Sequence, residues 1–165
     1  MKNYILIISI FLMTSCGISP QMGLANEMPK DFSFEFTYGL GGNTIDSKDE
    51  TYSKAMGASE DHIIIDFVFS EEEKEEIYQK MKEIGIQNYP DNISEGEEVF
   101  GIPQQEYLRV TCDGKEYNTC YAGFTHALER NKMHEDFEEL SSLIVSIIGK
   151  NEKVKSLPES KGGYE

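Results

Sequence analysis

The stretch "HIIIDFVFSEEEKEEIYQKMKEIGI" (residues 62–86) joins a strand pattern directly to a helix pattern and sets the class of the fold. In its first part, four large apolar residues alternate along one face of an extended chain: Ile63, Ile65, Phe67 and Phe69. The opposite face carries Ile64, Asp66 and Val68, so it is largely apolar as well. Because a strand that is apolar on both faces is typically covered on both, we predict a central strand here.

The second part of this stretch predicts a helix that begins after Ser70 and ends before Gly85. Ser70 and Glu73 have the spacing of a capping box, in which each side chain accepts from a backbone amide of the other residue. Apolar residues at helical spacing form the face that we expect to be buried: Ile77, Tyr78, Met81 and Ile84. Gly85 suits the left-handed conformation that follows many helices, and Pro90 prevents continuation.

Strands are predicted on both sides of this stretch. Before it, "DFSFEFTYG" (residues 31–39) alternates aromatic and polar residues, and weaker strand candidates follow at residues 43–46 and 50–56. After it, "YLRVTCDGKEYNTCYAG" (residues 107–123) predicts a hairpin, because Asp113-Gly114 tolerates the conformation of a two-residue turn. The segment between, residues 87–105, reads as a long polar loop with a short edge segment near residues 100–102.

A last apolar stripe predicts a C-terminal helix that reaches Gly149. The stripe consists of Met133, Phe137, Leu140, Ile144 and Ile147. Together these elements predict an α+β fold, with an antiparallel sheet of about four to six strands and two amphipathic helices packed on one face. We expect residues 31–165 to form a single domain, because no repeat or second long linker divides them.

The N-terminus predicts export and lipid attachment. A lysine at position 2 precedes ten uncharged residues (4–13), which as a helix would cover about 15 Å, half of a bilayer core. The following "LMTSC" resembles the lipobox of bacterial lipoproteins. That resemblance implies cleavage between Ser15 and Cys16 and a diacylglyceryl group on the Cys16 thiol, which supplies the two acyl chains that lasting membrane attachment needs. Cleavage after Gly17 with release of a free protein, or an uncleaved anchor, are the alternatives.

On this interpretation residues 1–15 are a signal peptide and residues 16–30 a lipidated N-terminus with a flexible tether. The domain would then lie on the outer side of the cell membrane, with the membrane as a partner through Cys16. The chain has 15 basic and 30 acidic residues, and one lysine falls within residues 1–15, so the remainder has a formal charge of 14 − 30 = −16. This charge argues against nucleic acid as a partner and against adhesion to an anionic membrane surface.

Cys112 and Cys120 are candidates for a disulfide in an oxidising compartment. A regular hairpin about Asp113-Gly114 would pair Cys112 with Lys115 and Cys120 with Tyr107. The two cysteines would then lie on opposite faces, about 16 Å apart, which excludes the bridge. A wide loop would permit it, so both states remain open at this point.

The remaining polar motifs predict no catalytic residue, metal or cofactor. "HEDFE" at His134 lacks the second histidine of a zinc-protease helix, so we expect His62, His126 and His134 to be solvated or capping residues. The glycine-rich residues 39–42 lack the lysine of a phosphate loop. Residues 46–50 lack the spacing of a calcium loop. We expect the acidic run at residues 71–76 to be a helix start and its solvated face.

Three segments resemble an uncharacterised family of small lipoproteins of Bacillus-like bacteria: "FSFEFTYGLGGNTIDS", "FVFSEEEKEEIYQKMKEIGI" and "SLPESKGGY". The resemblance implies an extracytoplasmic module on a lipid anchor and brings no known activity or site. We therefore expect a non-enzymatic binding module that presents the outer sheet face and residues 87–105 to a protein, peptide or envelope component. A hydrolase that uses a carboxylate pair and a passive acidic spacer are the alternatives.

Overall fold

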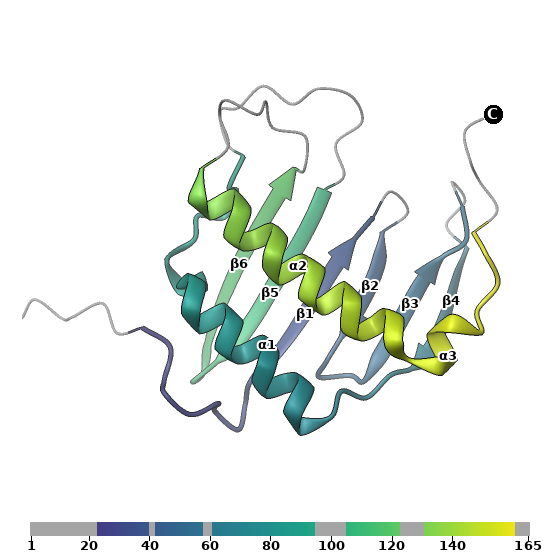
Figure 1. Cartoon of the computed structure of the whole chain (residues 1–165), viewed down its shortest axis with the longest axis horizontal. Helices are drawn as coiled ribbons and strands as arrows, with labels where there is room; N and C mark the ends of the chain where they lie inside the picture. The colour runs from purple at the N-terminus through teal and green to yellow at the C-terminus, as the bar shows by residue number, and fades with distance from the viewer. Residues whose placement is uncertain (1–22, 40–41, 58–60, 95–104, 123–130, 161–165) are drawn as a thin grey trace, which may run out of the picture.

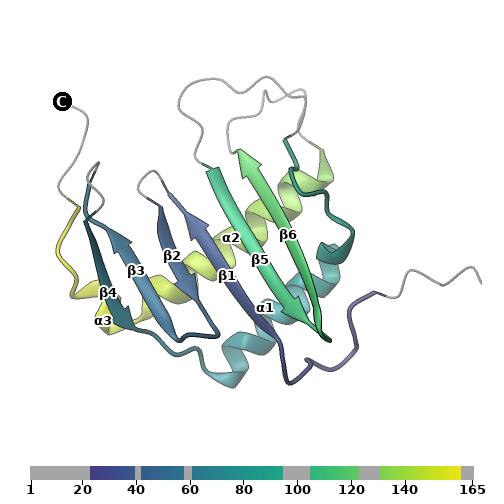
Figure 2. The ribbon, with the colours of Figure 1, turned by 180° about the vertical axis from the view of Figure 1, so that it is seen from behind.

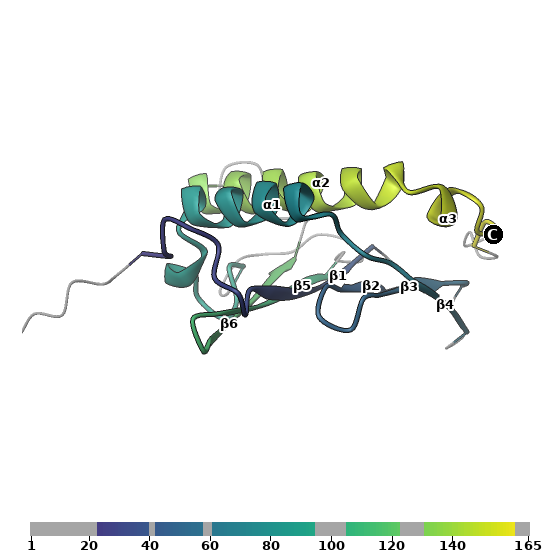
Figure 3. The same cartoon turned by 90° about the horizontal axis from the view of Figure 1, so that it is seen from below.

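A computed structural model describes residues 23–39, 42–57, 61–94, 105–122 and 131–160 (Figure 1). It confirms the α+β fold: six antiparallel strands form one sheet, and α1 and α2 pack side by side on one of its faces (Figure 3). The strand order is β4-β3-β2-β1-β5-β6. The elements are β1 (Ser33–Tyr38), β2 (Asn43–Asp46), β3 (Thr51–Ala55), β4 (His62–Asp66), α1 (Glu71–Ile84), a 3₁₀ turn (Ile86–Asn88), β5 (Gln105–Cys112), β6 (Lys115–Ala122), α2 (Lys132–Lys150) and α3 (Glu152–Lys155).

The core lies between the sheet and the two long helices. β1 supplies its centre, because Phe34 and Phe36 point toward the helices and are almost fully buried. The ring of Phe34 lies 5.2 Å from that of Phe69, which precedes α1, and Phe32 meets Tyr78 of α1 edge-on at 5.0 Å. Alternation along β1 therefore directs its aromatic side chains inward and leaves its polar ones on the opposite, outer face of the sheet.

The ends of both long helices are fixed by local signals. The capping box between Ser70 and Glu73 is present at the start of α1, and Gly85 at its end has φ 68°, as predicted. At the start of α2, Asn131 accepts hydrogen bonds from the amides of Met133 and His134. The stripe predicted for α2 is confirmed as well, since Phe137, Leu140, Ile144 and Ile147 are all buried.

The prediction of a central strand at residues 62–69 is wrong. β4 covers only His62–Asp66 and forms an edge of the sheet, where 67% of Ile64 is exposed. The apolar pattern is misleading because Phe67 and Phe69 lie beyond the strand, in the crossing to α1, where both side chains are buried in the core. Ile64 and Val68 on the other side have no second layer to cover them within the described residues.

The prediction of a flexible tether over residues 16–30 needs correction for residues 23–30, which pack on α1. The hydroxyl of Tyr78 donates to the carbonyl of Ala25 at 2.8 Å, and Lys82 Nζ donates to the side chain of Asn26 at 3.0 Å. Leu24 and Met28 lie against the core. Residues 1–22 lie outside the described part of the chain, and with them the predicted signal peptide. None of the described helices combines the length and the hydrophobicity that crossing a bilayer requires.

Candidate functional site

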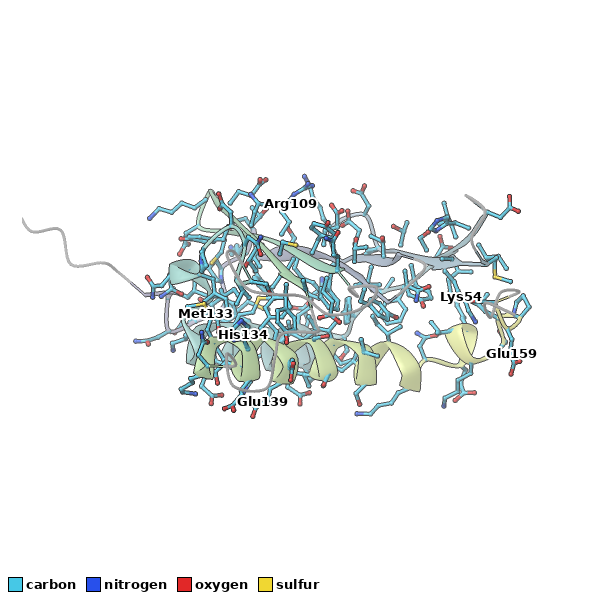
Figure 4. All side chains as sticks on the ribbon, turned by 90° about the horizontal axis from the view of Figure 1, so that it is seen from above. Lys54, Arg109, Met133, His134, Glu139 and Glu159 are labelled. Atoms are coloured by element: carbon cyan, nitrogen blue, oxygen red, sulfur yellow. The ribbon has the colours of Figure 1, made fainter. Side chains whose placement is uncertain are left out.

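The described helices leave the outer face of the sheet uncovered (Figure 2). Its side chains are mainly polar and charged, as alternation along β1, β5 and β6 predicts. The central ones are Ser33, Glu35, Thr37, Tyr107, Arg109, Thr111, Glu116 and Asn118. Figure 4 shows Arg109 on the side of the sheet opposite to α2, whereas His134 lies between sheet and helix.

Arg109 lies at the centre of this surface. Its Nη1 donates to Glu35 Oε2 across the β1–β5 pair at 3.0 Å, and its Nε lies 4.0 Å from Glu116 Oε1 of β6. Just over half of the arginine side chain remains exposed. The guanidinium therefore keeps donors available to a ligand while two carboxylates hold its position.

Two open hollows adjoin at Arg109 and Glu35. One has a volume of about 230 Å³ and extends toward β6, with Asp91, Tyr107 and Asn118 in its lining. The other has about 200 Å³ and extends toward β2, with Asp46, Lys48 and Thr111 in its lining. Both are smaller than typical pockets for small molecules, which are roughly 300–1,000 Å³. Their mixed donors and acceptors suit an extended polar chain that lies across the strands.

The predicted acidic segment at residues 46–50 forms a turn at the rim of this surface. Asp46 Oδ1 accepts the amides of Lys48 at 2.8 Å and Asp49 at 2.9 Å, so this carboxylate closes the turn between β2 and β3. Within the described residues no group of three or more histidine, cysteine or acidic side chains could hold a metal ion.

Cys112 and Cys120 are free in the structure, so the alternative of a disulfide between them is not realised. The hairpin is regular: Asp113 and Gly114 both have positive φ, Cys112 pairs with Lys115 and Cys120 pairs with Tyr107. Burial raises the pKa of both thiols, which disfavours the reactive thiolate. Ser15, Cys16 and His126 lie outside the described residues.

Of the other two histidines, one is solvated and one is a cap. His62 is exposed on β4, and its Nδ1 lies 2.9 Å from the Ser53 hydroxyl. His134 is fully buried, and its Nδ1 accepts the amide of Asn131 at 3.0 Å. Because Nδ1 accepts this hydrogen bond, the proton of a neutral His134 ring is on Nε2.

A pair of carboxyl groups beneath α2 is the site that sequence reasoning missed. Glu106 of β5 pairs across the sheet with Tyr121 of β6, whose hydroxyl donates to Glu138 of α2 at 2.5 Å. Burial raises the pKa of Glu106, and the negative charge of Glu138 adds to this effect, while a hydrogen bond with Ser141 opposes it. The register of the hairpin could have revealed Glu106, because it places residue 106 on the same inward face of β5 as Leu108.

We predict that Glu106→Gln stabilises the domain at neutral pH. Since the pKa of Glu106 is higher in the folded than in the unfolded chain, ionisation costs stability as the pH rises above its ordinary value of 4.5. Glutamine removes that cost and can still bond to Ser141. The melting temperature of the variant should exceed that of the wild type at pH 8, and the difference should vanish near pH 4. Glu76→Gln on the exposed face of α1 is the matched control, and an equal gain there would contradict the assignment.

No family model matches this chain, and no curated protein matches it either. The interpretation of the outer face and of the carboxyl pair therefore rests on their own geometry and chemistry.

Proposed function

We propose that this chain is a lipid-anchored extracytoplasmic binding module that receives its partner on the outer face of the sheet. The observation that carries the proposal is the pair of adjoining open hollows centred on Arg109. A face of this kind offers side-chain hydrogen bonds over several neighbouring strands, and the half-exposed Tyr107 adds aromatic contact area.

Charge favours a polar or cationic partner. The chain from Cys16 onward has a formal charge of −16, and Glu35, Asp46 and Glu116 bring this excess of acid to the hollows. A cationic peptide or envelope component is attracted by such a field, whereas nucleic acid is repelled.

The lipid anchor is proposed from the residues around Cys16. Because residues 23–30 pack on α1, only the residues before them can separate the domain from the lipid. From Cys16 to Gly23 there are 23 − 16 = 7 residue steps, which span at most about 25 Å when fully extended. A lipid on Cys16 would therefore hold the domain within that distance of the membrane. Partners would be met at or near the envelope surface.

Crosslinking on intact cells tests the binding face. A photoreactive residue in place of Asn118, exposed on the outer face of β6, should capture one discrete neighbour that mass spectrometry identifies. The same residue in place of Ser142, exposed on α2, is the matched control and should not capture it. Arg109→Ala, made together with the photoreactive residue at position 118, should reduce the yield at least about tenfold, because it removes the central donor without adding a negative charge that would attract a cationic partner. Equal capture from both positions would contradict the proposal.

A hydrolase that uses a carboxylate pair is the second candidate, and the raised pKa of Glu106 beside Glu138 is the observation that favours it. A carboxyl group whose pKa is raised keeps its proton to a higher pH than an ordinary glutamate, and a general acid must carry a proton to donate. Release of soluble fragments from purified cell-wall material by the wild type, with a loss of about a hundredfold or more in Glu106→Gln, would favour the enzyme. A passive spacer would show neither capture nor release.

A further inference from the structure

The two edges of the sheet differ in whether another segment of the chain pairs with them. At β6 the chain itself covers the edge: Ile93 donates its amide to the Cys120 carbonyl at 2.9 Å, and Cys120 donates to the Asp91 carbonyl at 2.8 Å. β4 lies at the opposite end of the sheet, and within the described residues no further strand pairs with it on the side away from β3. One edge is thus paired with a further segment of the chain, whereas β4 is the last strand at the other end of the sheet (Figure 1).

The pairing of β3 with β4 fixes which backbone groups face the open edge. Met56 donates to the carbonyl of Asp61 and Phe67 donates to that of Glu50. Hydrogen-bonded pairs alternate along an antiparallel ladder, so the odd-numbered residues of β4 bond to β3. The backbone groups of His62, Ile64 and Asp66 therefore point outward from the edge.

The side chains of this edge lack the usual protection against pairing. Proteins commonly blunt an edge strand with lysine, proline or a bulge, because an exposed apolar edge pairs with other strands. β4 itself contains no lysine, proline or bulge, and its Ile64 is 67% exposed. Lys153 of α3 reaches this edge at one end only, at the Asp66 carbonyl. Val68, just beyond the strand, is 57% exposed. An apolar, hydrogen-bonding edge of this kind is a template for another strand.

We propose that β4 pairs antiparallel with β4 of a second copy of this chain, about a two-fold axis at Ile64. The register follows from the outward groups: Ile64 lies opposite Ile64 of the second copy, and His62 lies opposite Asp66 of the second copy. These are the residues whose backbone amides and carbonyls are directed outward, so both copies present matching donors and acceptors. The interface is isologous, with the same strand used by both copies.

Charge complementarity favours a second copy as the occupant. The sequence "HIIID" consists of one histidine, three isoleucines and one aspartate, so antiparallel self-pairing places the histidine end of each copy against the aspartate end of the other, where an imidazole N–H can donate to a carboxylate. Lys153 Nζ donates to the Asp66 carbonyl at 3.3 Å. That carbonyl has a second lone pair and can accept the new strand as well.

Pairing at β4 would join the two sheets into one continuous sheet, with both Arg109 surfaces on the same side. If the lipid on Cys16 is present, the copies share a membrane, and confinement there raises their effective concentration. The inference does not depend on the proposed binding role or on the lipid, because it concerns the edge strand alone.

Sedimentation equilibrium of the purified full chain in density-matched detergent tests the proposal. The wild type should dimerise reversibly, Ile64→Val should behave like it, and Ile64→Lys should weaken dimerisation at least about tenfold, because two like charges would meet at the axis. Ile64 is exposed, so the lysine variant should keep its fold, and circular dichroism checks this. A wild type that remains monomeric at all concentrations, or a lysine variant that dimerises equally well, would overturn the proposal.

A charge exchange tests the register. His62→Glu should weaken dimerisation because it places glutamate opposite Asp66 of the second copy. The double variant His62→Glu/Asp66→Lys should restore it, because opposite charges then face each other again. If the double variant is no better than the single one, the antiparallel register about Ile64 is wrong.

Discussion

Replacement of Phe36 by alanine is expected to lower the free energy of unfolding by about 3–5 kcal/mol. Phe36 lies in the middle of the central strand β1, is only 1% exposed, and stacks on Tyr38 with ring centroids 5.4 Å apart. Its neighbours on the inner face, Ile45 and Leu108, are also buried and belong to strands on either side. Because strands hold these neighbours in place, they cannot collapse fully into the space that the ring leaves.

Urea denaturation of the purified chain measures this loss, with Glu35→Ala as the matched control on the same strand. Glu35 points to the outer face and forms a partly exposed ion pair with Arg109, so its removal should cost about 1 kcal/mol or less. Single domains are stable by only about 5–15 kcal/mol, so the phenylalanine variant should unfold at a much lower urea concentration. Comparable losses from both substitutions would contradict the assignment of the two faces of β1.

The elements predicted well from the sequence are those whose determinants lie close together in the chain. The start of α1 depends on Ser70 and Glu73, three residues apart, and its end depends on Gly85 alone. The β5–β6 hairpin depends on Asp113-Gly114, and its register follows from that turn by counting. The structure adds one distant contact, since the Asp31 carboxylate accepts both turn amides, at 3.0 and 2.6 Å.

The position of β4 could not be predicted because it depends on strand order, which is a long-range property. An apolar pattern on both faces is compatible with a central strand and with an edge strand that has an exposed face. The choice follows from β5, which pairs with β1 on the side away from β2 and leaves β4 at the end of the sheet. No residue near His62 or Asp66 indicates whether this strand lies at the centre or at the edge of the sheet.

The candidate site was predictable in part. Alternation along β1 and β5 shows which residues face outward, and thus that Arg109 and Glu35 each belong to a polar face. That they are directly opposite each other depends on the β1–β5 register, which links residues far apart in the chain. The packing of residues 23–30 on α1 was missed for a similar reason. It depends on single contacts such as that of Tyr78 with Ala25, which leave no periodic pattern in the sequence.

Substitution of Cys16 by serine is expected to have the largest effect of all on where the protein is found. If the Cys16 thiol carries a diacylglyceryl group, the wild type should partition into the detergent phase and remain with cell membranes. Burial of acyl chains contributes about 0.8 kcal/mol per methylene group, and two chains together give lasting attachment where one gives only marginal binding. Serine has no thiol to form the thioether, so the lipidated form should disappear completely.

Mass spectrometry of the purified chain decides the matter, because it identifies the first residue and the added mass together. The wild type should begin at Cys16 and carry at least two acyl chains, and Cys16→Ser should carry none. Cys120→Ser is the matched control, since it removes a thiol from β6 and should leave both the mass of the lipid and the membrane attachment unchanged. An unmodified N-terminus in the wild type would rule out the anchor. The protein would then diffuse freely. The partner of the outer face around Arg109 and the second copy at β4 would have to bind without the higher effective concentration that a shared membrane gives.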